Sequence, residues 1–392
     1  MTPELLVTLL LFMTSDSGRR GYKHLLDDFW DEARRSGIEL PCEDPVSAAA
    51  FCKARRKLKP ALMTSLLTRV CNAITDRHEE SLLWQGRRVF AIDGMRHNLQ
   101  RGDDLADVFG TPHGGLCPQM LVSTLYDVIG KFPCAATIAP QGSCERQELL
   151  KLIAHLGKGD VLVLDRGYPS FEVLQALTDA GIDFVIRVPK SGTFGAIQAF
   201  QERDGADSRV LIQPSPAEAR AGVKSLEVRA VRIDVGADEP WILLTSLRRC
   251  EIIRSLIGEI YHLRWEVEEF YKLLKSDYFT QRQFHAKSAD GVEQELRAQL
   301  LCTAIARLLM ANAVVESDTP HQRLSPKSGI LAVANGIIRL LLCDDPDRQP
   351  DHHASLLRRL AKHVVKRRPG RSYPRRSFKP GPRWNSKGRA RS

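Results

Sequence analysis

The chain has 392 residues, 43% of them hydrophobic, so it can bury a large core, and its length suggests about two or three domains. It carries 57 Lys and Arg against 47 Asp and Glu. Eleven of these cations lie in residues 366–392, a segment without any acidic residue. The rest of the chain, with 46 cations against the same 47 acidic residues, is close to neutral.

The composition argues against several protein classes. No two of the nine Cys have the C-x-x-C spacing of a zinc or redox site, so we interpret them as reduced thiols of a cytosolic protein. The apolar run 5–13 has no basic residues before it and no cleavage motif after it, which favours a buried helix over a signal peptide. The apolar segment 300–315 is interrupted by Arg307 and falls short of the roughly 18 residues of a membrane span. We therefore expect no membrane partner.

Residues 1–80 are predicted to form helices. A basic cluster precedes Pro60 and includes Arg55, Arg56 and Lys57. This N-terminal helical region is a candidate for binding DNA, although the same spacing equally suits a solvated helix face.

Residues 81–189 alternate between short β-type runs and helical stretches. Three apolar runs come first and predict three consecutive strands, and a helix, a strand, a helix and a further strand follow. The predicted helix that begins at Pro169 separates the last two strands. The order β-β-β-α-β-α-β is typical of a mixed α/β layer.

The second half of the chain divides into four predicted parts. Residues 190–247 read as a β-rich insertion, with β-prone runs between Pro and Gly turns. A long helical block begins near Cys250 and belongs to a second part of the core at 248–290. Further helices fill 291–365, and the basic tail 366–392 is predicted to be disordered.

Two predicted strands end in Asp followed closely by Gly: Asp93 in AIDG and Asp165 in LDRGY. Open α/β sheets commonly bind ligands where strands end in this way. Either Asp alone could equally cap a turn or a helix.

The helical stretch YHLRWEVEEFYKLLK places four polar residues on one side. On an ideal helix with about 100° per residue, Tyr261, Arg264, Glu268 and Lys275 lie within one narrow arc, opposite an apolar stripe. An ordinary solvated face with an Arg264–Glu268 pair would give the same spacing. However, Asp93, Asp165 and Glu268 together would suit Mg²⁺, which prefers oxygen ligands.

The tail and the loop after Asp165 supply further candidate contacts with DNA. A dense run of cations attracts polyanions through counterion release, and aromatic side chains among them can stack on bases. Arg375 and Arg376 are candidate DNA contacts in the tail, and Arg166 is another beside Asp165. Alternatively the tail only aids solubility, and Arg166 forms a structural ion pair.

Taken together, these residues resemble the DDE transposases of the insertion-sequence-four family. Tyr261, Arg264, Glu268 and Lys275 reproduce its Y-(2)-R-(3)-E-(6)-K signature, and AIDG and LDRGY are similar to its two Asp motifs. The resemblance implies a ribonuclease H-like mixed sheet with a β-rich insertion, an N-terminal helical domain that binds DNA and a helical C-terminal region.

The resemblance also implies a function. Asp93, Asp165 and Glu268 would be catalytic and would bind two Mg²⁺ or Mn²⁺ ions, while Tyr261, Arg264 and Lys275 would contact DNA. The protein would act as a homodimer on double-stranded DNA in the bacterial cytoplasm, in association with the nucleoid, cutting at terminal inverted repeats and joining the ends to target DNA. Two alternatives remain: a ribonuclease H-like endonuclease without strand transfer, and a catalytically inactive DNA-binding protein derived from a transposase.

Overall fold

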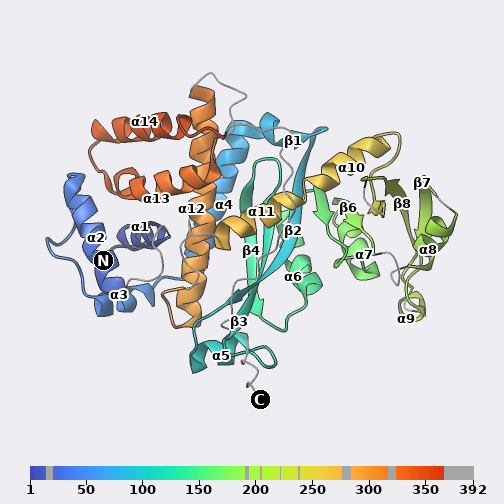
Figure 1. Cartoon of the computed structure of the whole chain (residues 1–392), viewed down its shortest axis with the longest axis horizontal. Helices are drawn as coiled ribbons and strands as arrows, with labels where there is room; N and C mark the ends of the chain where they lie inside the picture. The colour runs from blue at the N-terminus through green and yellow to red at the C-terminus, as the bar shows by residue number, and fades with distance from the viewer. Residues whose placement is uncertain are drawn as a thin grey trace, which may run out of the picture.

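The structure, a computed structural model, describes residues 1–14, 21–189, 194–203, 205–220, 222–236, 239–275, 284–316 and 324–365. The predicted basic tail lies outside these residues. A single sheet crosses the molecule, and the helices of the N- and C-terminal regions gather beside one end of it (Figure 1).

The sheet begins with a meander of three antiparallel strands. These are β2 (Arg87–Asn98), β3 (Gln119–Asp127) and β4 (Phe132–Pro140), with the short β1 (Leu83–Trp84) paired to β2. On its other side β2 pairs in parallel with β5 (Val161–Leu164), which pairs in parallel with β6 (Asp183–Arg187). Three meandering strands followed by parallel βα units are the predicted arrangement, and the α/β, ribonuclease H-like fold class is confirmed.

The predicted insertion extends this sheet. Its strands β7 (Asp207–Ile212), β8 (Leu226–Ile233) and β9 (Trp241–Thr245) are antiparallel, and β9 pairs with β6. The sheet order is therefore β4-β3-β2-β5-β6-β9-β8-β7. Two short helices, α8 (Gly195–Glu202) and α9 (Pro216–Arg220), accompany these strands.

Helices cover both faces of the sheet. One face packs on α6 (Glu145–Leu152), η2 (Ile153–His155) and α7 (Phe171–Asp179). Helix α7 begins at Phe171 rather than at the predicted Pro169, because Ser170 is its N-cap and its hydroxyl accepts a hydrogen bond from the Val173 N–H. The opposite face packs on α10 (Arg254–His262) and α11 (Trp265–Lys275).

The terminal helices pack on one another. Early elements of this layer are α1 (Pro3–Met13), α2 (Tyr22–Arg35), α3 (Ala48–Arg55), α4 (Pro60–His78) and η1 (Glu79–Leu82). Late ones are α12 (Ala289–Glu316), α13 (Pro326–Leu342) and α14 (Arg348–Ala361), and α5 (Asp103–Phe109) lies at the end of β2. Contacts join α1 to α13 and α4 to α12 (Figure 1). The predicted boundaries at 80 and 291 therefore separate helices that meet in space.

The long helix α12 is the central element of this layer. The most apolar 18-residue stretch within Ala289–Val315 has a mean hydropathy of 1.6, and the helix would be long and apolar enough to cross a membrane. However, 61% of its most apolar stretch is buried within the protein, against α4, α13, α14 and β4. A buried core helix has this composition for the same reason that a membrane span does, because both are surrounded by apolar groups.

Candidate functional site

Strand register places Asp93 and Asp165 beside each other. The parallel pair β2–β5 aligns Ala91 with Val163, and each Asp follows two residues later, Asp93 within β2 and Asp165 directly after the end of β5. Neighbouring strands in a sheet are about 4.8 Å apart, so the two aspartates lie at the same level of adjacent strands. The sheet thus brings together the two residues that the sequence separates.

Side-chain alternation then directs both aspartates to the same face. In β2 and β5, Val89, Ala91, Val161 and Val163 belong to the core on the α11 side, and the residues between them belong to the other core. Asp93 continues the first series by two residues within β2, and Asp165 follows Val163 by two residues just past the end of β5. Both carboxylates therefore belong to the face of the sheet that α11 covers.

The helical block that carries Glu268 is interrupted. The sequence predicts one helix through this region, whereas α10 ends at His262 and α11 begins at Trp265. Between them the backbone makes tighter bonds, from the Leu263 N–H to Ile260 O and from the Arg264 N–H to Tyr261 O, each 3.1 Å. A straight helical wheel therefore does not describe the relation between Tyr261 and Glu268.

The predicted polar face is consequently only partly exposed. Tyr261 is 2% exposed, and the centroid of its ring lies 5.1 Å from that of the Trp241 ring. Arg264 is 7% exposed and donates a 2.6 Å hydrogen bond to the Glu268 carboxylate. Neither residue presents an exposed group for DNA in this conformation, which corrects the expectation that both belong to an open face. Arg264 instead orients Glu268.

Tyr271, which the sequence analysis missed, anchors α11 at the site. Its hydroxyl donates a 2.5 Å hydrogen bond to the backbone carbonyl of Asp93 and lies 3.5 Å from that of Val122. Tyr271 follows Glu268 by one helical turn, so the bond that fixes the helix on β2 also fixes the position of Glu268. The sequence offers one signal for this role, a tyrosine within the apolar stripe of the helix, because a buried hydroxyl requires a hydrogen-bond partner.

The three acidic residues are near enough for their charges to affect one another. Burial raises the pKa of the Asp93 carboxyl to about 7, with further contributions from the negative charges of Asp165 and Glu268. The Gly94 N–H and Arg264 act in the opposite direction. Partial burial lowers the pKa of Lys275, and the charge of Asp93 opposes that shift. Lys275 therefore lies close enough to Asp93 to feel its charge.

The chemistry of these residues fits a divalent cation, although they are not arranged as a ready metal site. In the part of the chain that the structure describes, no three His, Cys, Asp or Glu side chains are disposed to hold a metal ion. Each carboxylate accepts a local hydrogen bond instead: Asp93 from Gly94 N at 2.9 Å, Asp165 from Gly167 N at 2.8 Å and Glu268 from Arg264. The raised pKa of Asp93 reflects burial first and the negative charges of Asp165 and Glu268 second, and a cation would neutralise those charges.

The other predicted DNA contacts are exposed, lie outside the described residues or, in the case of Arg55, are buried. Arg56, Lys57 and Arg166 are exposed, as is Lys275 at the end of α11. Arg375 and Arg376 lie outside the described residues.

Arg55 is a correction to the predicted basic cluster, because it is only 5% exposed. It forms a 2.9 Å ion pair with the buried Glu295 and donates hydrogen bonds to Gln294 at 3.0 Å, Gly291 O at 2.8 Å and Tyr22 at 2.8 Å. Its guanidinium therefore joins α3 to α12 and is unavailable to DNA.

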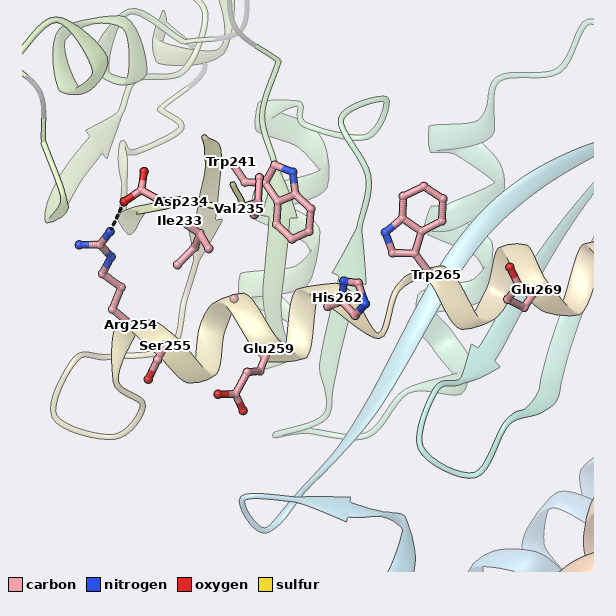
Figure 2. Close-up of a pocket in the computed structure, with 11 residues that line it drawn as sticks. Ile233, Asp234, Val235, Trp241, Arg254, Ser255, Glu259, His262, Trp265 and Glu269 are labelled. Atoms are coloured by element: carbon pink, nitrogen blue, oxygen red, sulfur yellow. Dashed lines mark hydrogen bonds and ion pairs between the residues drawn. The ribbon is translucent and has the colours of Figure 1, made fainter. Parts of the chain in front are cut away.

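A separate cavity of about 1060 Å³ lies beside α10 and α11. Figure 2 shows the rings of Trp241 and Trp265 on the same side as His262, with Arg254 paired to Asp234 at 3.4 Å farther along. The lining residues are Ile233, Asp234, Val235, Trp241, Arg254, Ser255, Gly258, Glu259, His262, Trp265 and Glu269. None of the three carboxylates of the candidate site is among them, so this cavity and the acidic site are distinct.

Comparison with known proteins identifies the family of the chain. Residues 84–305, more than half of the chain, match the family model described as "Transposase DDE domain". The chain is 25% identical over 301 residues to the Transposase InsG for insertion sequence element IS4 of Escherichia coli (strain K12). That alignment covers 70% of this chain and 64% of the relative, so the chain spans less than two thirds of the length of InsG.

Among solved structures, the piggyBac transposase synaptic complex with hairpin DNA matches with a TM-score of 0.46 and 12% identity, over 95% of this chain and 78% of that one. The matched family segment contains Asp93, Asp165 and Glu268. The resemblance seen in the sequence is thereby confirmed, and the chain belongs to the family of transposases with a DDE domain, of the insertion-sequence-four type.

Proposed function

We propose that this transposase binds the terminal inverted repeats of an insertion sequence, cuts DNA there and joins the freed ends to a target. The acidic site that would perform this chemistry consists of Asp93, Asp165 and Glu268. The supporting observation is the parallel register of β2 and β5, which brings the two aspartates together on the face covered by α11. A DDE domain that matches over this segment supports the same assignment.

The residues around the acidic site have different proposed roles. Mg²⁺ or Mn²⁺ ions, two by resemblance, bound by the three carboxylates would supply the Lewis acidity for the attacking and leaving oxygens of a phosphodiester. Tyr271 holds α11 on β2, and Arg264 orients the Glu268 carboxylate. Lys275 and Arg166, which are exposed cations near Asp93 and Asp165, would bind phosphate groups of the DNA.

Neutral substitutions of similar size test the catalytic assignment. Asp165→Asn and Glu268→Gln should each lower the rate of cleavage of a terminal-repeat duplex in Mg²⁺ by about a thousandfold or more, as expected for members of one catalytic unit. Binding of the same duplex in a mobility-shift assay should remain within about threefold of the wild type, since Asp165→Asn breaks no ion pair among the described residues and the amide oxygen introduced by Glu268→Gln can still accept the hydrogen bond from Arg264. Cleavage at the wild-type rate in either variant would contradict the assignment.

Strand transfer separates a transposase activity from that of an endonuclease. Purified protein incubated with a precut repeat end and a supercoiled plasmid should yield joined products, because a freed 3′-hydroxyl can exchange one phosphodiester for another. Nicked plasmid without joined ends would favour the endonuclease. We also propose that two copies act together on paired ends, which light scattering of the protein–DNA complex would test.

A further inference from the structure

Glu145 lies directly against the backbone beside Asp93. A Cβ atom placed on Gly94 would be 2.7 Å from Glu145 Cδ and 3.0 Å from both Cγ and Oε2. Gly94 is not among the glycines with positive φ, so its backbone conformation does not require glycine. Its missing side chain instead leaves room for the Glu145 carboxyl group, which α6 supplies from its first residue.

A buried hydroxyl points to the same place. Tyr168 is 1% exposed, and its Oη atom has no hydrogen-bond partner among the described residues. Burial raises the pKa of Tyr168, and the charges of Asp93 and Glu145, together with that of Asp165, raise it further. The hydroxyl is therefore close enough to these carboxylates to feel their charges. A buried donor without a partner is costly, so a bound oxygen, from water or phosphate, is the group that this position accommodates.

A surface ion pair does not account for these features. Arg96 Nη1 lies 3.4 Å from Glu145 Oε1, and both side chains are more than a third exposed. Pairs of this kind contribute little to stability. The pair explains neither the space left at Gly94 nor the unpartnered hydroxyl of Tyr168.

We propose that Glu145 is a fourth acidic residue of the site, which together with Asp93 provides oxygen ligands for a divalent cation. Glu145 reaches Gly94 from the α6 face, whereas Asp93 belongs to the α11 face, so the shared cation would lie beside the edge of β2 past Ala91, where the pairing with β5 ends. Tyr168 then donates a hydrogen bond to a water or phosphate oxygen held at this position. The inference rests on the proposed function, since it enlarges the acidic site that would cut DNA.

Titration with Mn²⁺ alone, followed by calorimetry in the absence of DNA, tests the proposal. Glu145→Gln keeps the size of the side chain and removes its charge, and should weaken binding by about tenfold or more, as loss of a supporting carboxylate does elsewhere. Arg96→Gln is the matched control for the ion pair and should leave the affinity unchanged or raised. Glu4→Gln, in the first turn of α1, controls for loss of a negative charge near a helix N-terminus.

A second substitution displaces the carboxylate without removing it. Gly94→Ala brings a methyl group into the space that Glu145 occupies, so Mn²⁺ binding should weaken as in Glu145→Gln. In a Glu145→Ala background the obstructing atoms are gone, and Gly94→Ala should then cause no further loss. This pair of measurements also serves if Glu145→Gln does not fold, which circular dichroism would show.

The result that overturns the inference is wild-type Mn²⁺ affinity in Glu145→Gln and in Gly94→Ala. Asp165→Asn in the same titration distinguishes this failure from failure of the proposed function. If Asp165→Asn weakens binding and Glu145→Gln does not, the three-carboxylate site stands and Glu145 is outside it. If Asp165→Asn also binds as the wild type does, the proposed metal site itself is wrong.

Discussion

Replacing Tyr271 by Phe should show whether the hydrogen bond of its hydroxyl, rather than the packing of its ring, positions α11 at the acidic site. The substitution keeps the ring, which lies next to Phe270, and removes the hydroxyl that donates to the Asp93 carbonyl at 2.5 Å. Loss of a buried hydrogen bond that leaves its acceptor behind should lower the free energy of unfolding by about 1–3 kcal/mol. Because Glu268 is one turn away on the same helix, the acidic site should also loosen.

The expected effect on activity exceeds the effect on stability. A displacement of about 1 Å at a reacting centre costs about a hundredfold in rate, so even a partial displacement should slow cleavage by about tenfold or more. Single-turnover cleavage of a labelled terminal-repeat end at saturating Mg²⁺ measures this directly, and chemical denaturation measures the stability.

Tyr126→Phe is the matched control for this experiment. The ring centroids of Tyr126 and Phe270 are 5.0 Å apart in the same core, but the Tyr126 hydroxyl is near the charge of Arg307 on α12 rather than bonded to the backbone at Asp93. It should lose similar stability and keep its cleavage rate. Equal rates in Tyr271→Phe and Tyr126→Phe would refute the positioning role, and unchanged stability in Tyr271→Phe would show that the bond to Asp93 is not made.

Three further predictions concern the helical layer. Arg55→Met should destabilise the protein by about 3–5 kcal/mol, because Glu295 would be left buried without its cation, and denaturation would measure the loss. Although burial opposes it, hydrogen bonds and charges from His285 and Arg55 lower the pKa of Glu295. At acid pH the unfolded state then binds more protons at this carboxyl than the folded state does. The stabilisation from Glu295 is therefore present above its ordinary pKa of 4.5 and is lost as pH falls through the lower pKa of the folded state. Glu295→Gln should flatten this dependence of the free energy of unfolding on pH. Arg56→Gln with Lys57→Gln should lower the slope of log affinity against log salt for duplex DNA by up to about 2, and an unchanged slope would remove these residues from the interface.

The fold could be predicted because its signals are local. Alternating and continuous apolar runs identify β2 to β6 and the strands of the insertion. Asp165 follows the end of β5, as predicted, whereas the prediction that Asp93 ends its strand is wrong, because β2 continues through it to Asn98. Which strand pairs with which is less local, yet the β-β-β-α-β-α-β order restricts the choice, since parallel neighbours require a crossover.

The parts that could not be predicted depend on partners far along the chain. Arg55 reads as one more cation of a basic cluster, and only the folded chain brings Gln294 and Glu295 to it. Likewise neither Pro nor Gly marks the break between α10 and α11, so periodicity alone predicts a continuous helix. Glu145 and Gly94 meet only when α6 packs against β2, which no spacing in the sequence expresses.

The pairing of β9 with β6 makes the far edge of the sheet a suitable place for engineering. The connection from β7 to β8 is separated from β5, which precedes Asp165, by strands β8, β9 and β6. At about 4.8 Å per strand this is a distance of roughly 15–20 Å. A fluorescent reporter or an affinity tag inserted into that connection would extend into solvent while the register of β2 and β5 is maintained, so the enzyme could be followed on DNA without alteration of its acidic residues.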